Sequence, residues 1–117
     1  MPPRILEQSR PRTSIQDYAP ATIQAFLRQK LVAKGVVEAY LFGSFVRGTV
    51  NPWSDLDLVV IKATEQPFVE RPLEFDDLFE LGIPVDILVY TPGEFGELRT
   101  SGSPFWQQFE KHHLRLI

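Results

Sequence analysis

The sequence contains no cysteine, which excludes disulfide bridges, thiolate metal sites and cysteine nucleophiles. No apolar run reaches the length of about 18 residues that a membrane span needs, and the first residues lack the apolar core of a signal peptide. Basic residues are not in excess: twelve Lys and Arg stand against fifteen Asp and Glu, and the net charge is −3. Nucleic-acid-binding proteins use a cationic excess to displace counterions. We therefore expect a cytoplasmic protein without a membrane span and without a nucleic-acid partner.

The 117 residues, 44% of them hydrophobic, are enough for one small domain with a buried core. Residues 1–20 contain four of the ten prolines and few large apolar side chains. We expect them to form an extended lead-in that is weakly ordered unless the core or a partner holds it. Residues 21–117 are expected to form the folded domain, and no internal repeat divides them.

Spacing and capping signals predict the helices. Apolar side chains at Ile23, Leu27 and Leu31 recur at helical spacing after Pro20, and Gly35 supplies a stop. Three further helices are expected: over 72–81 with proline at its first position, from the capping box at 91–94, and from the Ser-Pro cap at 103–104 to about residue 112.

Segments rich in β-branched and aromatic residues predict three strands, over 36–42, 55–61 and 84–90. The second strand alternates at first and then becomes continuously apolar, which is typical of a strand in a sheet interior. The order of helices and strands indicates an α/β or α+β fold. We expect a small mixed sheet of three to four strands with helices packed on one side.

Two acids, Asp55 and Asp57, lie two residues apart at the start of the second strand. Side chains at i and i+2 of a strand share one face, and their Cα atoms are about 6.6 Å apart. These carboxylates would therefore repel each other and would be costly to bury. A shared divalent cation in a cleft relieves the repulsion, and carboxylate oxygens suit Mg²⁺. The alternative is an edge strand with two solvated acids, although Asp is disfavoured in strands.

Asp86 is a third acid inside an apolar strand, flanked by Val85 and Ile87. If the second and third strands are neighbours, its carboxylate can reach the cleft of the other two acids. Its alternative role is a structural hydrogen-bond acceptor at the start of a strand.

The pair Gly43–Ser44 directly follows the first apolar strand. Such a turn suits a phosphate, because glycine lets the backbone approach an anion closely and the serine hydroxyl adds a donor. Arg47 follows and is expected to pair with a phosphate or with one of the acids. A glycine–serine turn is weak evidence alone, since many tight turns contain one, but here it precedes an Asp-x-Asp strand.

Gly43–Gly48 followed by Ser54–Val60 resembles the signature of the DNA polymerase beta nucleotidyltransferase superfamily. The third acid, 29 residues after Asp57, resembles the minimal nucleotidyltransferase (MNT) branch of that superfamily. The resemblance covers roughly residues 22–90 and implies a nucleotidyltransferase fold.

The resemblance also implies a role for each matched residue. Gly43 and Ser44 would hold the triphosphate of an incoming nucleotide, usually ATP. Asp55 and Asp57 would bind two Mg²⁺ ions that clamp the phosphates. Asp86 would ligate the metal nearer the acceptor hydroxyl and help to deprotonate it, after which the hydroxyl attacks the α-phosphorus and pyrophosphate leaves.

Minimal members resemble antitoxins that are paired with a helical HEPN-type toxin. The resemblance implies an enzyme that transfers AMP to a tyrosine of that partner. The alternative is an interaction module that neutralises the toxin by binding alone. A free-standing nucleotidyltransferase for RNA or an antibiotic is a third, less favoured option, and assembly with copies of itself or with another chain stays open.

Several other residues are expected to have plain structural roles. The adjacent residues His112 and His113 are expected to be exposed polar side chains and not a pair of metal ligands, since neighbouring histidines on a helix point about 100° apart. Trp53 could stack on an adenine, but packing at the edge of the core is favoured. Two roles are open for the aromatic residues of the last helix, which are a partner-binding patch or a helix face that closes the core: Phe105, Trp106 and Phe109. Four acids are expected to form the solvated face of their helix: Glu74, Asp76, Asp77 and Glu80.

Overall fold

The computed structural model describes residues 11–117. Its elements in chain order are η1 (Ile15–Asp17), α2 (Pro20–Ala33), β1 (Glu38–Phe42), α3 (Ser44–Arg47), β2 (Leu56–Ile61), η2 (Phe68–Leu81), β3 (Val85–Tyr90), α4 (Pro92–Arg99), α5 (Pro104–Lys111) and β4 (His113–Arg115). The first half of the predicted lead-in, residues 1–10, lies outside the described residues. Among the residues described, no helix is long and apolar enough to cross a membrane.

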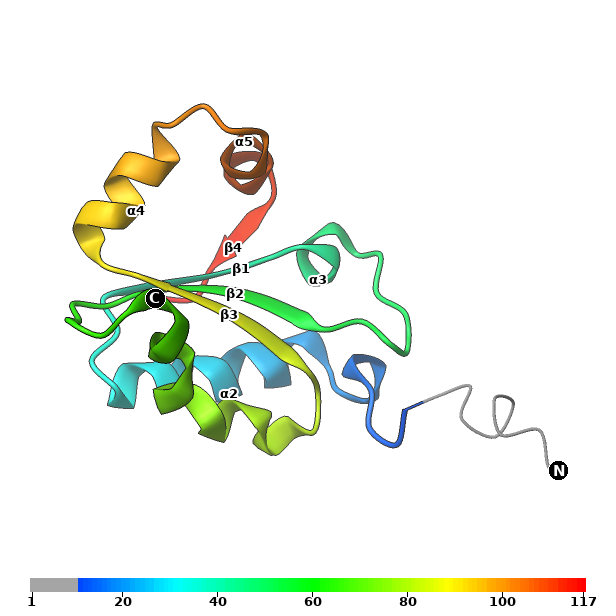
Figure 1. Ribbon diagram of the computed structural model, residues 1–117. Coiled ribbons are helices and arrows are strands. Elements are labelled where there is room, and N and C mark those ends of the chain that lie inside the picture. The colour runs from blue at the N-terminus through cyan, green and yellow to red at the C-terminus, as the bar shows by residue number, and fades with distance from the viewer. Residues whose placement is uncertain (1–10) are drawn as a thin grey trace, which may run out of the picture.

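Within residues 11–117 the strands form one mixed sheet of four strands in the order β3-β2-β1-β4 (Figure 1). The strands β2 and β3 run parallel, whereas β1 is antiparallel to both β2 and β4. The sheet confirms the predicted fold class. The short strand β4 was not predicted, because three residues are too few to show an alternating pattern.

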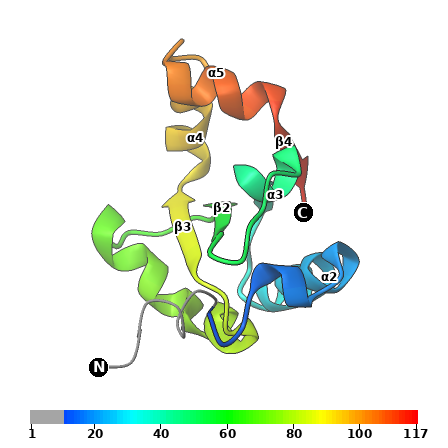
Figure 2. The same cartoon turned by 90° about the vertical axis from the view of Figure 1, so that its right-hand side faces the viewer.

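Helices cover both faces of the sheet, so the prediction that they pack on one side is wrong. Figures 1 and 2 show α2 beneath the sheet and α4 with α5 above it. The alternation of side chains along each strand explains the arrangement. In β2, Leu58 and Val60 belong to the core cluster that includes residues of α2 and η2, while Val59 and Ile61 belong to a second cluster with Phe95, Trp106 and Phe109.

The larger core also holds the end of the predicted lead-in. Ile15 of η1 is buried, and the Tyr18 hydroxyl donates to the carbonyl of Leu81 at 2.6 Å. The Ser14 side chain caps η1, accepting from the backbone N–H of Gln16 at 3.2 Å. The core therefore fixes this part of the chain, which is one of the two outcomes expected from the sequence.

The crossover segment η2 differs from the predicted helix. It begins at Phe68, ahead of the predicted start at Pro72, and it is a 3₁₀ segment with a non-helical residue at Phe75. A proline inside the segment has no N–H to donate, which disfavours a regular α-helix across it. The Lys62–Glu74 and Lys34–Asp77 pairs, at 2.8 and 3.2 Å, show that its acids are only partly a solvated face.

One ion pair ties η2 to the start of α4. Arg71 is buried, and its guanidinium donates to both carboxylate oxygens of Glu94, at 2.7 and 3.2 Å, and to the carbonyl of Val89 at 3.0 Å. Glu94 also accepts the backbone N–H of Thr91 at 2.9 Å, as the predicted capping box requires. Hydrogen bonds from Arg71 and then from Thr91 lower the pKa of Glu94 to about 2.

We predict that Glu94→Gln destabilises the domain by about 1–2 kcal/mol at pH 7, because Arg71 would lose its anionic partner while staying buried. A carboxyl with a lowered pKa stabilises the folded state above the pKa of the unfolded chain and ceases to do so as the pH falls. The difference between wild type and variant should therefore shrink as the pH falls from about 4.5 towards 2. Urea unfolding at several pH values measures it.

The matched control is Glu97→Gln, an exposed acid on the same helix. This control should leave the unfolding free energy within about 0.5 kcal/mol of wild type. Equal unfolding midpoints for the Glu94 and Glu97 variants would contradict a stabilising role for the Arg71–Glu94 pair.

Candidate functional site

The register of the parallel strands places two of the three predicted acids side by side. Asp57 of β2 is the direct partner of Asp86 in β3. Both lie between residues of the larger core, so their side chains belong to the opposite face of the sheet, the face covered by α4 and α5. On the other side of β2, the partner of Asp57 is Phe42, the last residue of β1.

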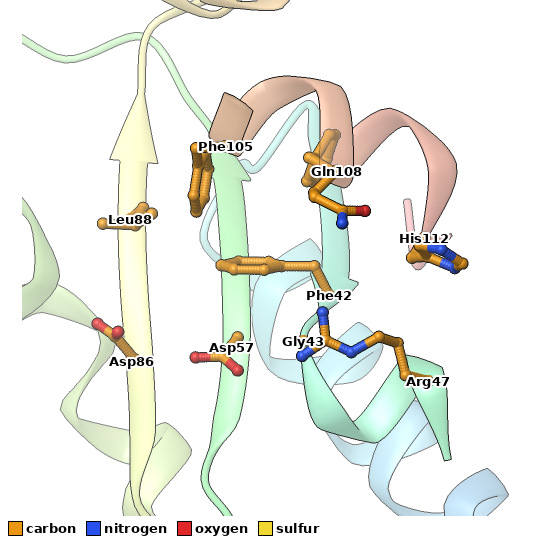
Figure 3. Close-up of a pocket in the computed structure, with 10 residues that line it drawn as sticks. Phe42, Gly43, Arg47, Asp57, Asp86, Leu88, Phe105, Gln108 and His112 are labelled. Atoms are coloured by element: carbon orange, nitrogen blue, oxygen red, sulfur yellow. The ribbon is translucent and has the colours of Figure 1, made fainter. Parts of the chain in front are cut away.

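A cleft of about 350 Å³ opens above these acids, between the sheet and α5. Its lining is formed by Phe42, Gly43, Arg47, Asp57, Asp86, Leu88, Phe105, Gln108, Phe109 and His112. Figure 3 shows four of these residues, Asp86, Asp57, Gly43 and Arg47, in one row along the cleft, with the rings of Phe42 and Phe105 above the row. The cleft thus has an acidic end, a cationic end and an aromatic wall.

The surroundings of Asp57 perturb its ionisation. Its pKa is raised from 3.8 to about 6, first because burial removes water from the carboxylate and then because Asp55 and Asp86 add negative charge nearby. Arg47 partly opposes this shift. The charged form of Asp57 is therefore costly in this cleft, and a cation placed between the acids would relieve the cost.

Gly43 makes the closest backbone approach to Asp57. Its φ of 75° and ψ of −152° lie in a region that only glycine adopts readily. A Cβ atom at this position would stand 2.1 Å from the Asp57 Oδ2 atom, which is a severe collision. Glycine is therefore needed at position 43 for two reasons: it adopts this backbone conformation, and it leaves room for the Asp57 carboxylate.

The remaining predicted residues surround this centre. Ser44 begins the single turn α3, and Arg47 ends it and extends into the cleft (Figure 3). Asp55 precedes β2 and, like Ser44, is not part of the cleft lining among the described residues, although its charge acts on Asp57. Across residues 11–117, no three His, Asp or Glu side chains are grouped so that they could hold a metal ion by themselves.

Sequence reasoning missed the wall that α5 contributes. Phe105, Gln108 and His112 all line the cleft, and their spacing of three and four residues places them on one face of a helix. That spacing is the signal that could have identified them. His112 is exposed, as predicted, but it lies at the edge of the cleft.

The aromatic residues divide between the core and the cleft. Trp106 and Phe109 are buried against the sheet and close the second core cluster. Trp53, for which packing in the core was favoured, is 58% exposed instead. It lines a separate hollow with Pro52 and Pro84, because the turn at Asn51–Ser54 carries it away from the acids.

The fold is similar to that of chains in three solved toxin–antitoxin complexes. One is a tri-AMPylated HEPN toxin of Shewanella oneidensis with its MNT antitoxin, at 20% identity and a TM-score of 0.56 over 85% of this chain and 72% of that chain. The second is a toxin–antitoxin pair with AMP-PNP, at 25% identity and a TM-score of 0.55 over 77% and 72%. The third is a mutant MntA–HpeT pair, at 23% identity and a TM-score of 0.55 over 86% and 73%.

No curated protein matches the sequence. The family model of the nucleotidyltransferase domain does match it, over residues 22–103. This range includes the glycine–serine turn, the Asp-x-Asp strand and the third acid, and it continues past residue 90 to residue 103. The match confirms the resemblance, and the chain belongs to the nucleotidyltransferase domain family.

Proposed function

We propose that this protein is an Mg²⁺-dependent nucleotidyltransferase that transfers AMP from ATP to a tyrosine of a HEPN-type toxin, and that it acts as the antitoxin of that partner. The observation that carries the proposal is the juxtaposition of Asp57 and Asp86 in adjacent parallel strands, with the Gly43 backbone packed on Asp57. A pair of acids can hold the metal ions through which phosphate transfer proceeds, and a glycine turn lets the backbone approach the phosphates closely.

The acids of the cleft fit a magnesium site that is completed by its substrate. Carboxylate oxygens are the ligands that Mg²⁺ prefers, and it is commonly held by one or two carboxylates together with substrate phosphates and water. Asp57 and Asp86 supply such a pair, and Asp55 adds charge to it.

Each residue then has a defined task. Bound Mg²⁺ would supply the positive charge that lowers the pKa of the acceptor hydroxyl and stabilises the leaving pyrophosphate. Gly43, Ser44 and Arg47 hold the phosphate oxygens in line, and the carboxylate of Asp86 takes the proton of the acceptor hydroxyl. The hydroxyl oxygen forms a bond to the α-phosphorus, and the bond between that phosphorus and the pyrophosphate oxygen breaks.

The accessible position of Asp86 supports an acceptor carried by another protein. Asp86 is exposed, so a hydroxyl on a separate chain can approach it from solvent. The structural relatives support the same partner, since two of them are a toxin–antitoxin pair with AMP-PNP and an AMPylated HEPN toxin with its MNT antitoxin. The third relative carries two aspartate-to-glutamate substitutions.

Neutralisation by binding alone is the second candidate. The lack of a preassembled three-ligand metal site within residues 11–117 is the observation that favours it. In that case the acids would keep the cleft hydrophilic without taking part in a reaction.

Incubation of the protein with Mg²⁺, α-labelled ATP and the product of its neighbouring gene tests the two candidates. We expect label on a tyrosine of the partner, and loss of labelling by about two orders of magnitude or more in Asp57→Asn and Asp86→Asn, because each variant removes a carboxylate from the reaction centre. Mass spectrometry of the partner identifies the modified residue.

Asp76→Asn is the matched control, because Asp76 is an exposed acid of η2 outside the cleft. It should label the partner at the wild-type rate. A partner that binds tightly and neutralises without label would contradict the enzyme and favour the binding module.

Gly43→Ala should abolish transfer, because the new methyl group would collide with the Asp57 carboxylate. Gly48→Ala separates this collision from backbone strain: Gly48 has a similar φ of 73°, but nothing lies within 4 Å of its would-be Cβ. Gly48→Ala should lose about 1–2 kcal/mol of stability from backbone strain alone, and Gly43→Ala should lose more, because the collision adds to its strain. Only Gly43→Ala should lose transfer activity, and equal activities in the two variants would be evidence against the proposed role of the turn.

The raised pKa of Asp57 predicts a gain in stability when its charge is removed. A carboxyl whose pKa is raised to about 6 stabilises the fold while protonated and loses that contribution as the pH rises through 6. In EDTA at pH 7.5, Asp57→Asn should therefore be more stable than wild type by about 1–2 kcal/mol, a value reduced for solvent screening.

This stability gain should vanish below about pH 4, where Asp57 is protonated in both states. Mg²⁺ with ATP should reverse the order at pH 7.5, because it stabilises only the chain that binds it. Thermal melts of both proteins measure these differences. An unchanged order of melting temperatures would argue against a metal site at Asp57.

A further inference from the structure

The cleft contains an aromatic surface to which the proposed reaction assigns no task, and the inference drawn from it rests on that proposed function. Arg47, Gly43, Asp57 and Asp86 form one row along the cleft, and Phe105 lies beside this row rather than on it (Figure 3). The order of the row follows the order of the elements. Arg47 ends α3 and Gly43 lies between β1 and α3, whereas Asp57 belongs to β2 and Asp86 to β3.

This row has a chemical direction. In an in-line displacement, the leaving pyrophosphate and the attacking hydroxyl lie on opposite sides of the α-phosphorus. Arg47 and Gly43 mark the phosphate end of the row, and Asp86 marks the acceptor end, so the α-phosphorus belongs near Asp57. The nucleoside must leave that position to the side of the row.

Phe42 and Phe105 occupy that side. Phe42 is the strand partner of Asp57, and its ring makes an edge contact with Phe105, with 5.6 Å between ring centroids and an interplanar angle of 83°. A second edge contact, at 4.9 Å, holds Phe105 against the buried Trp106. Phe105 nevertheless remains 44% exposed.

The start of α5 fixes the position of Phe105. Ser103 caps the helix and accepts the backbone N–H of Trp106 at 3.4 Å, and Pro104 occupies the first turn. The buried Trp106 and Phe109 anchor the same helix in the core. A ring held in this way is available to a ligand at a small cost in conformational entropy.

We propose that Phe105, supported by Phe42, is the surface on which the nucleobase of the bound nucleotide stacks. A planar base needs no specific hydrogen bonds for such a contact, because every base presents a π-face. The assignment gives α5 a role in nucleotide binding in addition to closing the core. It also replaces Trp53, the aromatic residue that the sequence had offered as a possible stacking partner, because Trp53 lies in a different hollow.

The test compares two ligands of the full chain in Mg²⁺ by calorimetry: ATP and inorganic tripolyphosphate, which lacks the nucleoside. We expect Phe105→Ala to weaken ATP binding about tenfold, the order of one base–aromatic stacking contact. Binding of tripolyphosphate should change less than twofold, which also shows that the variant is folded. Phe105→Trp should restore ATP binding, because it returns an aromatic face.

Phe79→Ala is the matched control, since Phe79 is 48% exposed but lies on η2, outside the cleft. It should bind both ligands as wild type does. In Phe105→Ala, an equal loss of affinity for both ligands, or no loss of affinity for ATP, would overturn the inference. A rise only in the KM for the partner protein, measured in the labelling assay, would also overturn it, because it would assign Phe105 to the acceptor. If wild type binds neither ligand, the proposed function itself fails, and the inference fails with it.

Discussion

The cleft depends on two acids that the sheet holds side by side. Asp57 and Asp86 are partners in parallel strands, so they cannot move apart unless β2 and β3 lose their pairing. The larger core opposes that loss, because Leu58 and Ile87, their neighbours in sequence, are buried on the opposite face. Burial of apolar surface thus holds together two charges that would otherwise separate. The pKa of Asp57 is raised first by burial and then by the charges of Asp55 and Asp86, so the repulsion is one part of that shift.

The same alternation makes the site sensitive to strand register. A shift of one residue in β2 would place Asp57 in the apolar core and Leu58 in the cleft. The continuous apolar run Leu58–Ile61 offers little resistance to such a slip by itself, since it is apolar on both faces. The start of β2 resists it, because the slip would bury the Asp57 carboxylate and move the fully buried Leu56 out of the core. Stability and function therefore depend on the same pairing.

Local patterns in the sequence located the acids and the glycine turn of the cleft better than its walls. The Asp-x-Asp strand, the third acid and the glycine turn are local patterns, and each needs only its own strand to be recognised. The placement of α5 over the acids depends on contacts between distant segments, which no local spacing reports, and so Phe105 and His112 were not assigned to the cleft. The one-sided arrangement of helices was wrong for the same reason: a continuously apolar strand indicates two covered faces, but the segments that cover them are identified only in the folded chain.

The C-terminal segment connects the core to the cleft. Phe109 packs on Tyr40 with a centroid distance of 5.5 Å and stacks on His113 at 4.9 Å, and β4 pairs His113 with Phe42. Phe109 of α5 and His113 of β4 are thus both attached to β1, the strand that leads into the glycine turn. A displacement of α5 would alter the backbone next to Asp57 as well as the wall above it. The cleft and the second core cluster therefore share structural support, since Phe109 lines the one and belongs to the other.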